Sequence, residues 1–94
     1  MAHARKKLPA FPGTGELSYR SAAIPVEYEI LGDPATLRLG PLRLRGSFTA
    51  TPETAEEAFR EGECALKLEN ATTFRIVMLG HTAGSGTAYF EMRV

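Results

Sequence analysis

The segment ECALKLENATTFRIVM, residues 63–78, decides the fold class of this chain. Its apolar residues recur at every second position in two runs, Cys64, Leu66 and Leu68, then Phe74, Ile76 and Met78. A period of two is typical of strands that bury one face. The pair Asn70-Ala71 stands between the runs, where an asparagine tolerates the positive φ of a tight turn. The segment therefore predicts a β-hairpin.

The same alternation continues on both sides of this hairpin. The outlying apolar sets are Val26, Tyr28 and Ile30 before it, and Ala88, Phe90, Met92 and Val94 after it. Pro25 cannot donate to a ladder, so we expect it at a strand start or on a sheet edge. Residues 36–49 are compatible with two short strands around Gly40-Pro41 or with one strand broken by a bulge. Residues 15–20 are the candidate for a first strand.

One helix is predicted at about residues 52–61. Thr51 is a typical N-cap, and a proline follows it at the first helical position. Ala55, Ala58 and Phe59 fall at helical spacing and form a narrow apolar stripe. We expect Phe59 to anchor this helix on the sheet, because it is the only large apolar residue of the stripe.

Together, these elements predict a mainly β fold, a small antiparallel six- to seven-stranded barrel or curled meander with one short helix. Residues 14–94 form the single predicted domain. Residues 1–13 are predicted to be a basic, disordered tail, because Arg5, Lys6 and Lys7 occur there without apolar periodicity.

The charge is balanced overall but unevenly distributed along the chain. Eleven basic and eleven acidic residues give the 94-residue chain a formal net charge of zero. Residues 1–45 carry seven basic and four acidic residues, whereas residues 46–94 carry four and seven. The charge distribution along the chain is therefore dipolar. A dedicated nucleic-acid binder is usually basic overall, and this chain is not.

Neither an export signal nor a membrane span is evident from the sequence. No apolar run approaches the roughly 20 residues that a spanning helix needs, and no apolar segment follows the basic residues of the tail. We therefore expect a cytoplasmic protein with no membrane partner.

The single cysteine, Cys64, excludes an internal disulfide and a Cys-rich metal site.

The glycine-rich segment GHTAGSG, residues 80–86, contains the one candidate ligand-binding residue, His81. A Cys64–His81 dyad would need an orienting third group, which the sequence does not supply. No metal-ligand spacing and no phosphate-binding motif is present. We therefore expect no enzyme, no cofactor and no metal, and a small-ligand pocket near residues 80–86 is the third functional hypothesis.

Two other patterns suggest binding surfaces. Arg38, Arg43 and Arg45 face away from the leucines of their segment and form a candidate basic stripe, which could bind single-stranded nucleic acid with help from Tyr19 or Tyr89. The simpler interpretation is that these arginines keep an exposed sheet soluble. A further set, Leu31, Val77 and Leu79, lies outside the predicted core. Such surplus apolar area favours a protein partner or self-association, which is the leading hypothesis.

Three short motifs also suggest a relationship to other chains. They are Gly-x-Gly-x-Leu at residues 13–17, Leu-x-Leu-Glu at 66–69 and Gly-Thr-Ala-x-Phe at 86–90. In this order around a short helix, they resemble small bacterial β-proteins of uncharacterised function. The resemblance implies the fold of residues 13–94 and implies no activity.

Overall fold

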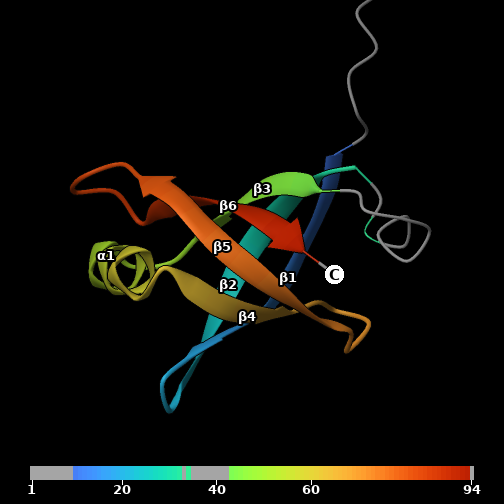
Figure 1. Ribbon diagram of the computed structural model, residues 1–94, viewed down its shortest axis with the longest axis horizontal. Coiled ribbons are helices and arrows are strands. Elements are labelled where there is room, and N and C mark those ends of the chain that lie inside the picture. Colours follow the sequence, from blue (N-terminus) through green and yellow to red (C-terminus); the bar gives the residue numbers. More distant parts are fainter. Residues whose placement is uncertain (1–9, 33, 35–42, 94) are drawn as a thin grey trace, which may run out of the picture.

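The protein is seen here as a computed structural model that describes residues 10–32, 34 and 43–93 (Figure 1). Its elements are β1 (Ala10–Tyr19), β2 (Ala22–Leu31), β3 (Leu44–Thr49), α1 (Pro52–Glu61), β4 (Glu63–Lys67), β5 (Thr73–His81) and β6 (Thr87–Arg93). The strands of this described part form a closed antiparallel barrel in the order β1-β2-β3-β6-β5-β4. The prediction of a small β-barrel with one short helix is confirmed.

Two three-stranded meanders make up the barrel, and α1 connects them. The β3–β6 seam joins the meanders through six residue pairs. The β1–β4 seam closes the barrel through only three pairs, from Glu16↔Lys67 to Ser18↔Ala65. Closure therefore depends on a short ladder between two strands that are almost fifty residues apart in the chain.

Alternating residues fill the barrel as the sequence predicts. The fully buried large side chains are Leu17, Ile30, Phe48, Leu66, Ile76, Phe90 and Met92. The rings of Phe48 and Phe90 stack with their centroids 6.3 Å apart. These residues come from all six strands, so one core holds the whole barrel together.

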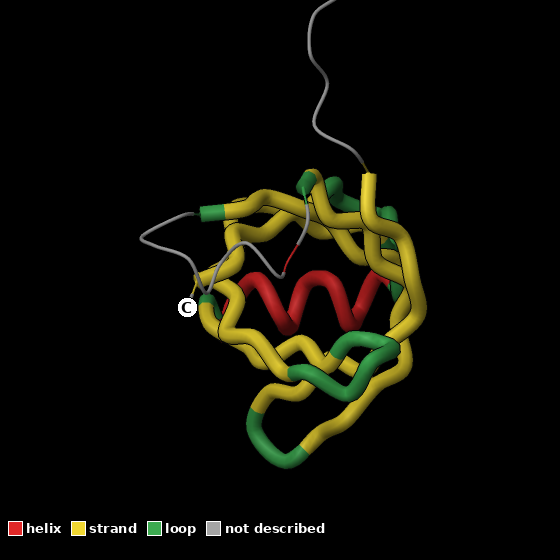
Figure 2. The backbone as a smooth tube through the Cα atoms, turned by 90° about the vertical axis from the view of Figure 1, so that its right-hand side faces the viewer, coloured by secondary structure: helices red, strands yellow, loops and turns green. Residues whose placement is uncertain are grey.

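Helix α1 lies across one end of the barrel (Figure 2) and contacts β4, β5 and β6. The Thr51 hydroxyl caps it by accepting a hydrogen bond from the amide of Thr54 at 3.2 Å. The face turned to the barrel consists of Thr54, Ala55 and Ala58. Small side chains on this face let the helix approach the barrel closely.

The prediction that Phe59 anchors the helix is wrong. Its side chain is 41% exposed, and its ring packs beside that of His81 at 5.0 Å between centroids. At about 100° per residue, Phe59 lies at the border of the buried stripe centred on Ala55 and Ala58. The buried face therefore includes Thr54 in place of the expected Phe59, and Ala55 and Ala58 belong to it as predicted.

Strand β1 begins at Ala10, four residues before the predicted domain boundary. Residues 10–13 therefore belong to the ladder with β2 and not to a tail.

The edge of β1 beyond its short pairing with β4 is protected in two ways. Pro12 has no amide hydrogen, and the amide of Thr14 donates to the Glu69 carboxylate at 2.8 Å.

Pro25 lies inside β2, opposite Glu16 of β1. The amide of Thr14 points away from β2, so in this antiparallel register the nitrogen of Pro25 points away from β1. The β2–β3 ladder reaches only to Glu27. Pro25 therefore lies where no neighbouring strand needs its missing hydrogen, which agrees with the expected edge position.

One predicted local feature lies partly outside the described residues, and another is changed by the structure. The segment 36–42, which was expected to carry strand residues, lies outside the described residues, and β3 begins at Leu44 and continues to Thr49. In the β4–β5 turn it is Ala71, with φ of 68°, and not Asn70 that adopts the left-handed conformation. The side chain of Asn70 instead accepts a hydrogen bond from the amide of Thr72 at 3.0 Å.

Candidate protein-interaction face

The predicted arginine stripe maps partly to the outside of β3. Arg43 and Arg45 are both exposed, whereas Arg38 lies outside the described residues. Arg43 forms an ion pair with Glu91 of β6 at 3.8 Å. Arg45 stands between Leu31 and Glu91 in the ladders of its two neighbouring strands. The described part of the stripe is therefore mixed in charge and in contact with an apolar residue.

A groove opens beside Arg45 on the outer face of four strands, β2, β3, β6 and β5. It has a volume of about 360 Å³ and is lined by Glu29, Leu31, Arg45, Gly46, Ser47, Leu79, Tyr89 and Phe90. We call it the outer groove. Three of its side chains are large and apolar yet strongly exposed: Leu31 at 44%, Leu79 at 48% and Tyr89 at 47%.

The strand register explains why these side chains meet outside the barrel. Leu31 follows buried Ile30, so it points outward at the end of β2. Tyr89 lies between the buried residues Ala88 and Phe90 and also points outward. A register shift between Met78 and Gly80 interrupts the β5–β6 ladder at Leu79.

This bulge leaves Leu79 without a paired residue in β6 and directs its side chain to the surface beside Tyr89. Beside Arg45, strand β3 contributes the small residues Gly46 and Ser47 to the groove, so its floor is low. The sequence alone identifies Leu31 and Leu79 as surplus apolar residues. It does not identify Glu29 or Gly46 as their neighbours, because that requires the strand order.

His81 has a different environment from the one predicted. It is the last residue of β5, pairs with Ala88 in the ladder and packs its ring against Phe59. Its loop, residues 82–86, is held to the β3–α1 junction by a hydrogen bond from the Ala50 amide to the Gly86 carbonyl at 2.8 Å. His81 therefore helps to seat the helix, and no binding role is assigned to it by these contacts.

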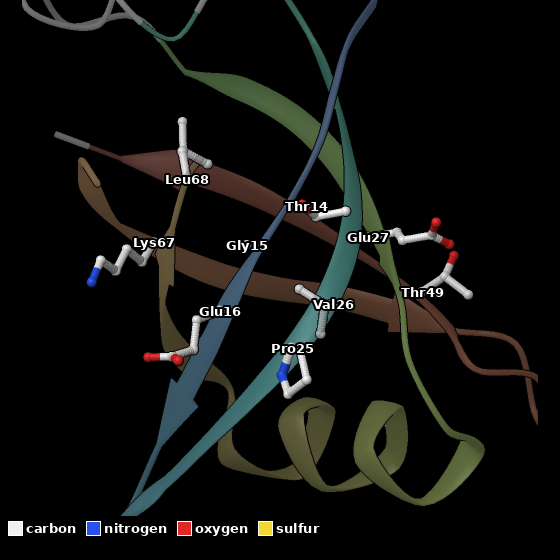
Figure 3. A pocket seen from close by; sticks show the side chains of 9 residues that line it. All are labelled: Thr14, Gly15, Glu16, Pro25, Val26, Glu27, Thr49, Lys67 and Leu68. Carbon is white, nitrogen blue, oxygen red and sulfur yellow. The ribbon is translucent and has the colours of Figure 1, made fainter. Parts of the chain in front are cut away.

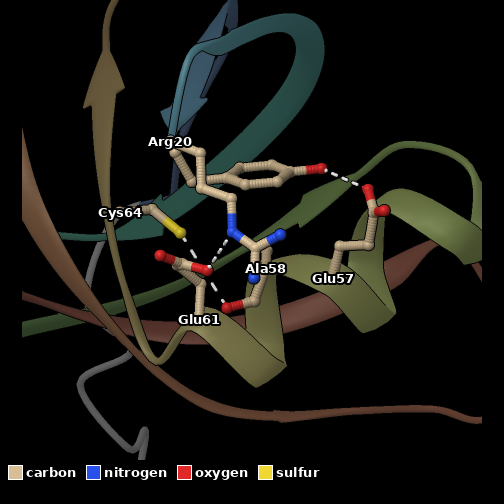
Figure 4. A network of polar contacts seen from close by, with 6 residues as sticks. Arg20, Glu57, Ala58, Glu61 and Cys64 are labelled. Atoms are coloured by element: carbon tan, nitrogen blue, oxygen red, sulfur yellow. Dashed lines mark hydrogen bonds and ion pairs between the residues drawn. The ribbon is translucent and has the colours of Figure 1, made fainter.

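Cys64 is buried under α1, and Figure 4 shows its thiol directed at the carbonyl of Ala58, with an Sγ–O distance of 3.9 Å. Burial raises the pKa of the thiol to about 11, and the nearby Glu61 adds to this effect. At neutral pH the group is a thiol and not the nucleophilic thiolate.

The Cys64–His81 dyad is not assembled. Cys64 pairs with Ile76, which precedes His81 by five residues along β5, a separation of roughly 16 Å in an extended strand.

Tyr19, which was predicted to help Arg38, Arg43 and Arg45 to bind nucleic acid, is buried, and its hydroxyl donates a hydrogen bond to Glu57 of α1 at 2.8 Å. Burial, together with this hydrogen bond, raises the pKa of Tyr19 to about 12.

A second, more polar depression lies over β1, β2 and β4 (Figure 3) and is lined by Thr14, Gly15, Glu16, Pro25, Val26, Glu27, Thr49, Lys67 and Leu68. The carboxylates of Glu16 and Glu27 point away from each other in this view. They do not converge as a general acid–base pair would. Within residues 10–32, 34 and 43–93, no three His, Cys, Asp or Glu side chains are grouped so as to hold a metal ion.

No family model, curated protein or solved structure matches this chain. The resemblance to small bacterial β-proteins therefore stays a prediction. Over the part of the chain that the structure describes, no helix has the length and apolar character to cross a membrane. The choice between functions consequently depends on the surfaces of the barrel itself.

Proposed function

We propose that this chain is a non-enzymatic interaction module that binds a polypeptide through the outer groove. The observation that carries the proposal is the convergence of Leu31, Leu79 and Tyr89, from three different strands, on one concave strip of the surface. Exposed apolar patches with a polar rim are typical of protein–protein contacts. Tyrosine is also among the residues that carry most of the energy at such contacts.

The chemistry of the remaining candidates supports a binding role over catalysis. Cys64 is a protonated thiol beneath the helix. His81 is engaged by the ring of Phe59. Neither side chain lines the outer groove, so the groove offers shape and apolar surface without a cysteine thiol or a histidine base.

Site-specific photo-cross-linking tests the proposal in cells that contain the full chain. A photoreactive phenylalanine analogue replaces Tyr89, and the matched control carries the analogue at Thr14, which is exposed on the outside of β1. We expect discrete protein adducts from position 89 that Leu79→Ser abolishes. Equal adduct patterns from both positions, or none from position 89, would refute the assignment of this face.

Binding of single-stranded nucleic acid is the second candidate, because Arg45 and Tyr89 line the same groove. A cation beside an aromatic ring suits a phosphate and a stacked base. Glu29 on the rim and Glu91 beside Arg45 oppose a polyanion. A salt-dependent affinity for an oligonucleotide between about 50 and 200 mM salt that Arg45→Ala weakens would favour this candidate over the first.

A further inference from the structure

The rim of the outer groove carries one cation and one anion. Arg45 and Glu29 are both exposed and both line the groove. Neither takes part in the ion pairs of the described residues, which include Arg20–Glu61, Arg43–Glu91, Arg60–Glu56 and Arg75–Glu63. Each of the two charges is therefore available to a molecule that enters the groove.

The two charges flank an apolar residue in a defined arrangement. Leu31 is the direct cross-strand neighbour of Arg45 and lies two residues after Glu29 on the same face of β2. Arg45 and Glu29 are thus diagonal neighbours across the β2–β3 ladder, at about 7–8 Å between backbone positions. On this face, Leu31 therefore has a cation, Arg45, beside it on β3 and an anion, Glu29, two residues before it on β2.

We propose that the occupant of the outer groove is a second copy of this chain, in an isologous two-fold contact. Arg45 of each copy meets Glu29 of the other, and the apolar side chains Leu31, Leu79 and Tyr89 pack in the centre. The inference rests on the proposed function and names its partner.

Charge complementarity selects a second copy over a partner of one sign. A two-fold contact requires a patch that is complementary to itself, and an apolar strip with one free charge of each sign meets that requirement. An acidic partner would leave Glu29 opposed by a like charge, and a basic partner would do the same to Arg45. The formal net charge of zero removes overall repulsion between two copies.

The contact is small, so we expect a reversible dimer. Few side chains on each copy take part, and interfaces at the small end of the range are weak and transient. The monomer also has a complete core of its own, with Phe48, Phe90 and Met92 almost inaccessible to solvent. Folding and association are therefore separable in an experiment.

Analytical ultracentrifugation of the purified full chain, from micromolar to millimolar concentration, tests the proposal. We expect a monomer–dimer equilibrium that Leu79→Ser weakens at least about tenfold. Phe59→Ser is the matched control, because Phe59 is similarly exposed but is not among the residues that line the groove. It should leave the equilibrium constant unchanged.

Charge reversal then tests the pairing itself. Arg45→Glu and Glu29→Arg each place like charges against each other in a homodimer, so each variant alone should be monomeric where the wild type dimerises, an effect of about tenfold or more. An equimolar mixture of the two variants restores both ion pairs across the interface. The mixture should therefore dimerise, although each chain still carries its own charge reversal.

The outcomes separate this inference from the proposed function. Dimers in the mixture, and not in either variant alone, support the two-fold contact. A wild-type chain that stays monomeric at millimolar concentration, or a mixture that stays monomeric, overturns it. If position 89 still cross-links to a different protein in cells, the groove is an interaction site whose partner is not a second copy.

Discussion

At the residue scale, alternation predicts burial inside the barrel far better than it predicts the packing of the helix. Every second residue of a strand faces the core, so Val26, Tyr28 and Ile30 are buried as expected. A helix with only three apolar positions does not fix the centre of its stripe. The barrel end accepts Ala55 and Ala58 at close range, which leaves the larger Phe59 at the margin.

Two phenylalanines test this distinction. Phe48 is 1% exposed within the barrel and Phe59 is 41% exposed on α1. We expect Phe48→Ala to lower the free energy of unfolding by about 3–5 kcal/mol, because it opens a cavity. Phe59→Ala should cost no more than about 1 kcal/mol. Urea denaturation checks both values, and a larger loss from Phe59→Ala would mean that the helix depends on this ring.

Cys64 and Tyr19 predict how stability depends on alkaline pH. Folding raises the Cys64 pKa from 9.0 to about 11 and the Tyr19 pKa from 10.0 to about 12. Both groups favour their neutral forms in the folded state, so their contribution is intact below pH 9 and is lost progressively as pH rises through 9 to 12. The urea midpoint should fall across this window.

Variants separate the two contributions. Cys64→Ala should flatten the lower part of the decline and Tyr19→Phe the upper part, whatever either change does to stability at pH 7. A midpoint that stays constant up to pH 12 in the wild type would contradict the buried, protonated state of both groups.

At the element scale, strands were predictable where their side chains alternate, and junctions between elements were not. The bulge at Leu79 lies beside Gly80, and a glycine there is compatible both with a bulge inside a strand and with the start of a loop. The early start of β1 was hidden by Pro12 and Gly13, residues that usually end strands. Both are tolerated because this stretch of β1 pairs with β2 alone.

Gly86 holds one of these junctions together. A methyl group placed on it would lie 1.8 Å from the Ala50 carbonyl oxygen, whereas at Gly80 it would meet no atom within 4 Å. We expect Gly86→Ala to cost about 1–3 kcal/mol, because the loop must move off the β3–α1 junction. Gly80→Ala is the control, with a change within about 0.5 kcal/mol. Equal effects in thermal denaturation would show that the junction is not tightly packed.

At the scale of the whole molecule, the candidate site was only partly predictable. Leu31 and Leu79 stand out in the sequence because each adds an apolar residue outside the inward set of its strand. Their proximity depends on the order β2-β3-β6-β5, which places residues from three distant segments on one outer face. Strand order is a property of the closed barrel, and no local pattern encodes it.

The same applies to the charges of this face. Arg45 was identified as an outward residue, but its relation to Glu29 required the β2–β3 register. A stripe that is basic along the sequence becomes a strip with both signs of charge once the neighbouring strands are in place. This change is the reason why we propose a polypeptide and not a polyanion as the occupant.

A series of two-dimensional amide NMR spectra of the full chain, from micromolar to millimolar concentration, tests whether the outer groove is the contact surface between two copies. We predict concentration-dependent shifts at Leu31, Arg45, Leu79 and Tyr89, with Thr14 and Lys67 on the opposite outer face unaffected. Shifts that cluster on α1 around Phe59, or that spread evenly over the barrel, would contradict the assignment of the outer groove as the contact surface.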